Sequence, residues 1–173
     1  MASIVGRQQG GATWSYLVDG TLLGQQIECG NISQWLCWWN GGGEPDSTVI
    51  GANETGAPVS YLTITMPAGY LNLDPESLQV TLQWTAPAAG TYRVKGNFLG
   101  VDTNEASHPV AIVHNTTTLY SNTISSFNQK ENFKLTVPVE ANDTIGFVVS
   151  SNGWTYLSTG LQATIQLQST PAP

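Results

Sequence analysis

Two runs of alternating residues, one on each side of a short break, constrain most strongly what this chain can fold into. The run LQVTLQWT at 78–85 has an apolar residue at every second position, and YRVKGNF at 92–98 follows the same rhythm. Successive side chains of a strand point to opposite faces, so each run is apolar on one face and polar on the other. Pro87 to Gly90 break the pattern as a turn does. The segment predicts two half-buried antiparallel strands joined by a short turn.

The same period of two recurs along most of the chain. It is clear at 133–139 and 161–168, and turn-forming residues separate the runs. No long window has apolar residues at the i, i+3, i+4 and i+7 positions of a helix. About nine to eleven short strands with frequent turns predict an all-β fold, an antiparallel β-sandwich of jelly-roll type. We expect one domain at 13–168, preceded by an N-terminal arm at 1–12 and followed by a C-terminal tail at 169–173.

Hydroxyl and amide side chains, rather than charges, supply the polar surface. Charged residues make up 10% of the chain and the net charge is −7, whereas roughly 25% charged residues is ordinary. The five Lys and Arg residues are few and dispersed in the sequence, which argues against nucleic acid or anionic lipid as a partner. No apolar run approaches the roughly 20 residues that span a bilayer. We expect neither nucleic-acid binding nor membrane insertion.

The two cysteines, Cys29 and Cys37, have a spacing that matches no common zinc pattern. The alternatives are a local disulfide and two buried free thiols. We predict the disulfide, which indicates a secreted or cell-surface protein. The first residues lack the apolar region of a signal peptide, so we expect that any such signal was removed.

An aromatic cluster, WLCWW at 35–39, lies in a segment from Gly24 to Asp46 that has little strand periodicity. We predict a long loop pinned by the disulfide. Exposed tryptophan rings on such a loop bind the C–H faces of sugar rings. Alternatively the rings cover one end of the sandwich, since tryptophan is usually largely buried. Trp38 and Trp39 are adjacent and cannot easily both enter one core, which favours the sugar platform.

The candidate ligand-binding residues follow from that platform. Asp46 could bind sugar hydroxyls beside the rings, and Trp154, just after a turn, could add a second contact patch. The full set is Trp35, Trp38, Trp39, Trp154 and Asp46.

No catalytic motif occurs, and we predict that the protein is not an enzyme. A glycosidase needs two facing acids, which sequence alone does not reveal. His108 and His114 lie about 20 Å apart along one expected strand, too far to share a metal ion. No cofactor is predicted, although Asp102, Asn104 and Glu105 could hold a structural Ca²⁺ together with backbone carbonyls.

Several segments carry a family resemblance: LNLDPES at 71–77 with the run at 80–102, VAIVHN at 110–115, and ANDTIGFVVSSNG at 141–153 with STGLQATI at 158–165. They resemble a domain of bacterial secreted proteins, many of which carry PEP-CTERM sorting tails. The resemblance implies a jelly-roll-like sandwich similar to carbohydrate-binding modules. It implies no catalytic residues.

Two functions from different classes follow. The leading hypothesis is a non-catalytic extracellular binding module whose partner is a polysaccharide or other glycan. The alternative is a structural subunit of an extracellular filament or surface layer. In that case copies of the chain would assemble through the N-terminal arm, which adds a strand to a neighbour's exposed edge.

Overall fold

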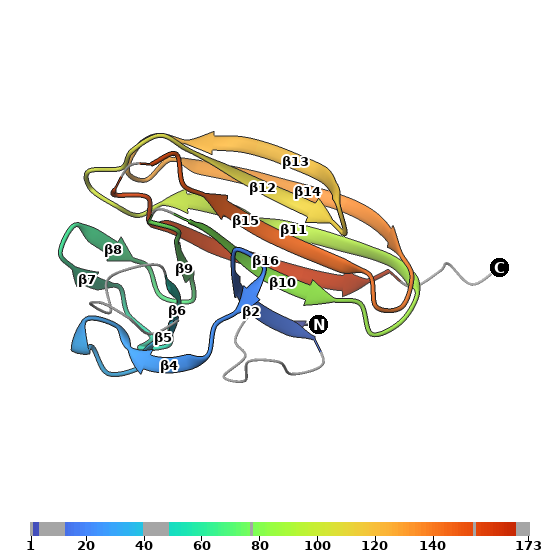
Figure 1. The fold of residues 1–173 in the computed structure, drawn as a ribbon, viewed down its shortest axis with the longest axis horizontal. Coiled ribbons are helices and arrows are strands. Elements are labelled where there is room, and N and C mark those ends of the chain that lie inside the picture. Colours follow the sequence, from blue (N-terminus) through green and yellow to red (C-terminus); the bar gives the residue numbers. More distant parts are fainter. Residues whose placement is uncertain (1, 4–12, 40–48, 77, 154, 169–173) are drawn as a thin grey trace.

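The structure is a computed structural model that describes residues 2–3, 13–39, 49–76, 78–153 and 155–168. Nearly all of the regular structure in this part of the chain is strand (Figure 1). The elements are β1 (Ala2–Ser3), β2 (Trp14–Val18), β3 (Thr21–Leu22), β4 (Gln25–Glu28), η1 (Cys29–Asn31, a 3-10 turn), β5 (Trp35–Trp39), β6 (Val49–Asn53), β7 (Val59–Tyr61), β8 (Ile64–Met66), β9 (Leu71–Asp74), β10 (Gln79–Thr85), β11 (Gly90–Gly100), β12 (His108–His114), β13 (Thr117–Ile124), β14 (Lys130–Val139), β15 (Thr144–Ser150) and β16 (Thr159–Leu167).

Strands β9 to β16 form a jelly roll. One sheet, here called sheet A, contains the order β14-β11-β16-β9, and the other, sheet B, contains β13-β12-β15-β10. The chain thus passes back and forth between two interleaved four-stranded sheets, which is the jelly-roll connectivity. Every pairing in these sheets is antiparallel. The predicted all-β sandwich of jelly-roll type is confirmed, with more strands than the nine to eleven expected.

The turn after β10 carries the chain from one sheet to the other. β10 pairs with β15 and β2, whereas β11 pairs with β14 and β16. The two predicted strands and the turn between them are therefore present, and the strands lie in different sheets. Their apolar faces meet across the core, where the rings of Trp84 and Tyr92 lie 4.8 Å apart. Alternation identifies the buried face of a strand and says nothing about its neighbour.

The main core fills the space between the sheets, and Phe133 lies among several of its aromatic rings. Its ring centroid is 5.4 Å from Phe98, 5.7 Å from Phe147 and 6.0 Å from Tyr120. Phe98 and Phe147 are fully buried, and burying one such side chain contributes about 1.5–3 kcal/mol. This packing gives the loops at the end of the sandwich a rigid base.

Residues before β9 extend sheet A with β6, β5 and β4. The long loop predicted at 24–46 is therefore wrong where the structure describes it, because β4 and η1 occupy residues 25–31 and β5 occupies residues 35–39. The signal was hidden because β5 is covered on both faces, and such a strand shows no alternation. Trp38 packs against the main core and stacks on Tyr16 at 5.3 Å, while Trp35 and Trp39 belong to a smaller cluster on the opposite face.

The smaller cluster lies on the outer face of sheet A, where the β7–β8 hairpin covers it. Cys29 and Cys37 form a disulfide within it, as predicted. Gly51 lies opposite Cys37 in the sheet, and a Cβ there would lie 2.5 Å from the Cys37 sulfur. The glycine therefore makes room for the disulfide. Closing a loop of this size stabilises by about 2–3 kcal/mol in the chain-entropy model.

The described part of the N-terminal arm pairs with its own chain. Ala2 and Ser3 lie opposite Ile165 and Thr164 of β16, while residues 4–12 and the tail at 169–173 lie outside the described residues. Assembly through the arm stays a prediction. No helix in the described residues has the length and apolar character needed to cross a membrane.

Candidate functional site

A small pocket lies at one end of the sandwich, under the β7–β8 hairpin. The hairpin is held over it by backbone hydrogen bonds to the loop after β11, from Thr65 N–H to Val101 and from Thr103 N–H to Thr63. The pocket has a volume of about 150 Å³. We call it the end pocket; its lining residues are Cys29, Gly30, Trp35, Val49, Tyr61, Leu62, Thr63, Ile64, Asn72, Asp74, Glu76, Asp102, Thr155, Tyr156 and Ser158.

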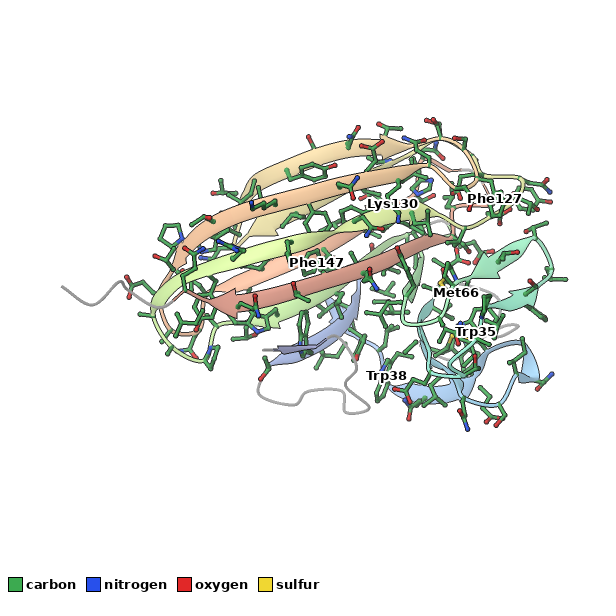
Figure 2. The ribbon with its side chains drawn as sticks, turned by 180° about the vertical axis from the view of Figure 1, so that it is seen from behind. Trp35, Trp38, Met66, Phe127, Lys130 and Phe147 are labelled. Atoms are coloured by element: carbon green, nitrogen blue, oxygen red, sulfur yellow. A yellow bond between two sulfur atoms is a disulfide. The ribbon has the colours of Figure 1, made fainter. Side chains whose placement is uncertain are left out.

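Two aromatic side chains form one wall of the end pocket. Trp35 lies on β5 and is only 1% exposed, and its ring meets Tyr61 of β7 edge-on with centroids 6.4 Å apart. Figure 2 shows Trp35 near Met66 under the hairpin, with Trp38 further along β5. The three β5 tryptophans therefore do not form one exposed platform. Of them, only Trp35 contributes to the end pocket.

Two buried polar atoms of the lining have no hydrogen-bond partner among the described residues. They are the indole Nε1 of Trp35 and the side-chain oxygen of Asn72. Trp35 Nε1 lies 3.2 Å from the position of a Cβ on Gly51, and Gly51 pairs with Asn72 across the sheet. Leaving a buried donor or acceptor unpaired costs about 1–3 kcal/mol. A hydroxyl group both donates and accepts, so a bound hydroxyl would suit this donor and acceptor.

Two aspartates are anchored at the floor of the end pocket. Ser158 donates to Asp74 Oδ2 at 2.7 Å, and Thr63 donates to Asp102 Oδ2 at 2.9 Å. Asp102 Oδ1 accepts the N–H of Asn104 at 2.8 Å, so both of its carboxyl oxygens are occupied. Burial raises the pKa of Asp74 to about 6, against the lowering effect of the Ser158 hydrogen bond. Asp74 therefore changes charge near neutral pH.

The rim of the end pocket has an unusual backbone. Leu62, Glu76 and Tyr156 all line it with positive φ, at 51°, 46° and 65°. Such a conformation in a bulky residue costs of order 1–3 kcal/mol and tends to occur at functional sites. Leu62 is 78% exposed and Tyr156 is 48% exposed. The rim thus presents an apolar and an aromatic side chain to solvent above a polar floor.

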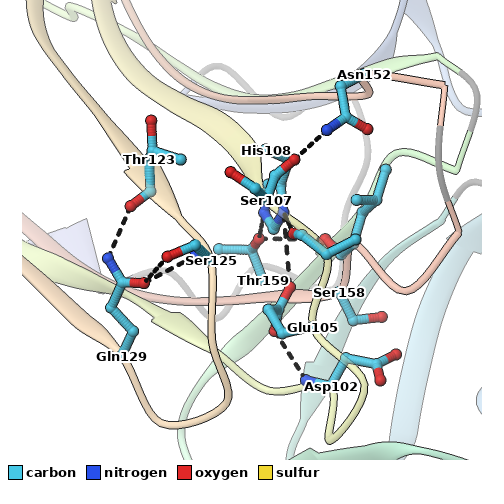
Figure 3. A network of polar contacts seen from close by, with 12 residues as sticks. Asp102, Glu105, Ser107, His108, Thr123, Ser125, Gln129, Asn152, Ser158 and Thr159 are labelled. Atoms are coloured by element: carbon cyan, nitrogen blue, oxygen red, sulfur yellow. Dashed lines mark hydrogen bonds and ion pairs between the residues drawn. The ribbon is translucent and has the colours of Figure 1, made fainter.

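Behind the floor, the side chains of Glu105, His108 and Thr159 form a buried network (Figure 3). His108 Nδ1–H donates to the Ala106 carbonyl at 2.8 Å, which leaves Nε2 to accept from the Thr159 hydroxyl at 2.6 Å. Glu105 Oε1 lies 3.6 Å from Nδ1. A hydroxyl, an imidazole and a carboxyl in this order resemble a nucleophilic triad. Thr159 is fully buried, so no substrate reaches it and the network is structural.

Burial disfavours the charged form of both ionisable groups in this network. It raises the pKa of Glu105 to about 8, and the nearby carboxyls of Asp102 and Asp74 add to the shift. It lowers the pKa of His108. Sequence reasoning missed this network because its members come from two distant segments.

The remaining predicted residues are placed as follows. Asp46 and Trp154 lie outside the described residues. Asp102 and Glu105 make hydrogen bonds within their own loop, Glu105 Oε2 accepting the Asp102 N–H at 3.0 Å. No group of three or more His, Cys, Asp or Glu side chains in the described ranges is arranged to hold a metal ion. His114 lies apart from His108 and contacts Asp143 at 2.9 Å.

Comparisons with known proteins find partial similarities in structure only. No protein-family model matches the sequence, and no curated protein matches it. A family 35 carbohydrate-binding module from an environmental isolate shares 16% identity at a TM-score of 0.40, over 70% of this chain and 98% of that one. A CBM35 from Paenibacillus barcinonensis shares 15% at 0.38, over 70% and 98%. Pika GITRL shares 22% at 0.38, over 51% and 79%.

The fold assignment rests on the strand order described above rather than on these similarities. The resemblance of the sequence to the PEP-CTERM-associated domain stays a prediction.

Proposed function

We propose that the protein is a non-catalytic, extracellular carbohydrate-binding module and that its end pocket takes one sugar ring of a glycan. The observation that carries this proposal is an open pocket whose rim presents the half-exposed ring of Tyr156 above the carboxylate of Asp74. Trp35 Nε1 and Asn72 Oδ1 are buried behind this lining without a hydrogen-bond partner among the described residues, and a sugar hydroxyl would pair with them where the lining side chains move aside. At about 150 Å³ the pocket is smaller than the roughly 300–1,000 Å³ of typical ligand sites, so it suits a single ring or a chain end.

The rim and the floor supply the other two elements of sugar recognition. Tyr156 offers a ring face to the C–H groups of a sugar, which bind aromatic faces by burial. Asp74 offers a carboxylate to accept a hydroxyl, and hydrogen bonds to ionised acceptors are about twice as strong as neutral ones.

Three acids line the end pocket, Asp74, Glu76 and Asp102, and their presence alone does not make it a glycosidase site. A glycosidase needs one acid to protonate the leaving group and another to attack or activate water. Asp102 is 2% exposed and its two oxygens each accept a hydrogen bond from Asn104 or Thr63. It is thus held in a structural role, and we expect no products from any glycan that binds.

Loss of the rim ring is expected to weaken binding. The Tyr156→Ala variant removes the stacking face, and we expect about tenfold weaker binding, since aromatic contacts contribute about 0.5–1.5 kcal/mol beyond their burial. Affinity gel electrophoresis against neutral mannan, xylan, galactan and a soluble cellulose derivative measures this. Phe127→Ala is the matched control, because Phe127 is 37% exposed but lies outside the pocket lining. Equal retardation of wild type and Tyr156→Ala in every gel that retards the protein would argue against the proposal.

Binding is expected to depend on pH through Asp74. The pKa of Asp74 is raised to about 6, so the carboxylate is present above that pH and becomes a weaker, neutral acceptor below it. Affinity for the glycan that retards the protein in the gels should therefore fall severalfold between pH 7.5 and pH 5, with the midpoint of the change at about pH 6. Asp74→Asn should bind weakly at both pH values. Calorimetric titration of both proteins decides the point: identical pH profiles would exclude a role for Asp74.

A further inference from the structure

The outer face of sheet A carries the described cationic side chains. In β11, Val94 and Phe98 point into the main core, so Arg93 and Lys95 point to the opposite side of the sheet. Both are exposed. Figure 2 views the molecule from behind and shows β14, β11 and β16 side by side.

The register extends this pattern to the next strand. Lys134 of β14 lies directly opposite Lys95, and Lys130 lies opposite Leu99, which shares the outer face with Lys95. Every Lys and Arg of the described residues is therefore on one face of two neighbouring strands; they are Arg93, Lys95, Lys130 and Lys134. The fifth, Arg7, lies outside the described residues. These cations are dispersed along the sequence, and the pairing of β11 with β14 brings them together.

No acidic residue shares the outward positions of β11, β14 and β16. In a chain with a net charge of −7, this is a marked separation of charge. Lys95 and Lys134 make no ion pair with a described residue. Like charges directly opposite one another destabilise a sheet. A ligand with negative charge would offset that repulsion.

A groove of about 530 Å³ crosses this face at the middle of the cationic stripe. Besides Lys95 and Lys134, its lining includes the amide and hydroxyl side chains of Asn97, Asn132, Gln162 and Thr164. One acid, Glu54, also lines the groove, but it comes from the turn after β6 and lies outside the two cationic strands. Asn97 lies opposite Asn132 on one side and Gln162 on the other, so three amides form a row beside the lysines. The groove wall is fixed by Tyr70, whose hydroxyl donates to Asn97 Oδ1 at 3.0 Å.

We infer that this groove binds an acidic polysaccharide, a polymer bearing carboxylate or sulfate groups between neutral hydroxyls. Arg93 and Lys130 flank the groove at the two ends of the cationic stripe. Arg93 lies opposite Thr136, which is six residues from Lys130 along β14. At 3.3 Å per residue, the stripe is therefore about 20 Å long. A repeating anion spans this length, whereas a small one does not. The amide row suits hydroxyls. The inference goes beyond the proposed function, since it concerns a second surface and another class of glycan.

Affinity electrophoresis in gels containing polygalacturonate or carrageenan tests the inference. The wild type should be retarded in at least one, and the retarding polymer identifies the anion as carboxylate or sulfate. Retardation should disappear as sodium chloride approaches about 0.5 M, because salt screens exposed charges. The Lys95→Gln/Lys134→Gln variant should bind about tenfold more weakly, since it loses two charge-assisted contacts.

The matched control makes the same change in net charge on the other sheet. Thr118→Glu/Ser121→Glu changes exposed positions of β13 in sheet B, and both double variants have a net charge of −9, two less than −7. This control should bind like the wild type. Retardation of the wild type by neither polymer, equal losses in both double variants, or equally tight binding of single-stranded DNA would overturn the inference. Neutral-glycan binding is measured with the same proteins, so failure of the groove and failure of the end pocket are told apart.

Discussion

Replacing Gly96 with alanine is expected to lower the free energy of unfolding by about 3 kcal/mol or more, at the upper end of the usual cost of overpacking. A Cβ at this position would overlap the carbonyl oxygen of Gln162 and would lie 2.8 Å from the Cα of Ala163. Both are backbone atoms of β16, the strand paired with β11. They cannot rotate away as a side chain can, so the two central strands of sheet A would have to separate. Urea denaturation followed by tryptophan fluorescence measures the loss.

Gly146 in β15 provides the control for that experiment. The atom nearest to an added Cβ there would be the methyl carbon of Thr81, at 3.1 Å. A side-chain methyl can shift by a few tenths of an ångström. Gly146→Ala should therefore cost less than about 1 kcal/mol. Similar losses in the two variants would contradict the strand pairing described for β11 and β16.

Replacing Glu105 with glutamine is expected to stabilise the protein at alkaline pH, by on the order of 4 kcal/mol above pH 8. The pKa of Glu105 is raised from 4.5 to about 8 by burial, and each unit of pKa difference corresponds to about 1.36 kcal/mol. Glutamine keeps an oxygen for the Asp102 N–H, which Glu105 Oε2 accepts at 3.0 Å. It carries no charge that must be buried when the pH rises.

The direction of this effect follows from proton binding. Between pH 4.5 and about 8 the folded chain keeps a proton on Glu105 that the unfolded chain has lost. The stability of the wild type therefore falls as pH rises through this window and levels off above it. Asp74, whose pKa is raised to about 6, contributes in the same direction between pH 3.8 and about 6. His108, whose pKa is lowered from 6.5, acts oppositely and only below pH 6.5.

The window from pH 6.5 to 9 thus isolates Glu105. Urea unfolding should show wild-type stability declining from pH 6.5 to about 8 and levelling off toward pH 9, while Glu105→Gln stays level throughout. Glu140→Gln, at an exposed position in the turn before β15, should follow the wild type. A parallel decline in Glu105→Gln would mean that the Glu105 carboxyl is not the group responsible.

Much of the fold could be predicted from the sequence, because one-sided burial leaves a visible period of two. Residues 78–85 and 161–168 follow that period closely, and both are strands. Strand partners could not be predicted, since alternation specifies a face and no neighbour. β5 was missed because Trp38 enters the main core while Trp35 enters the cluster under the hairpin. Because β5 contacts a different hydrophobic cluster on each face, the adjacent Trp38 and Trp39 are both accommodated.

The candidate site was less accessible to sequence reasoning. Trp35 was a candidate residue and lines the end pocket, but Asn72, Asp74 and Tyr156 were not identified. Asn72 and Asp74 sit on the outward face of β9, and their role depends on the hairpin folded over them. The one available signal was polar residues within an otherwise apolar strand, LNLD. The cationic stripe likewise emerges only when β11 and β14 are paired.

The indole N–H signals of Trp35 and Trp84 offer the most direct test of sugar binding in the end pocket. In the described part of the chain neither Nε1 atom has a hydrogen-bond partner, and both are buried, but of the two only Trp35 lines the pocket. We expect that two-dimensional proton–nitrogen NMR, during titration with an oligosaccharide of the best-binding neutral glycan, will move the Trp35 signal and leave that of Trp84 in place. A Trp35 signal that stays fixed at saturation would contradict the account.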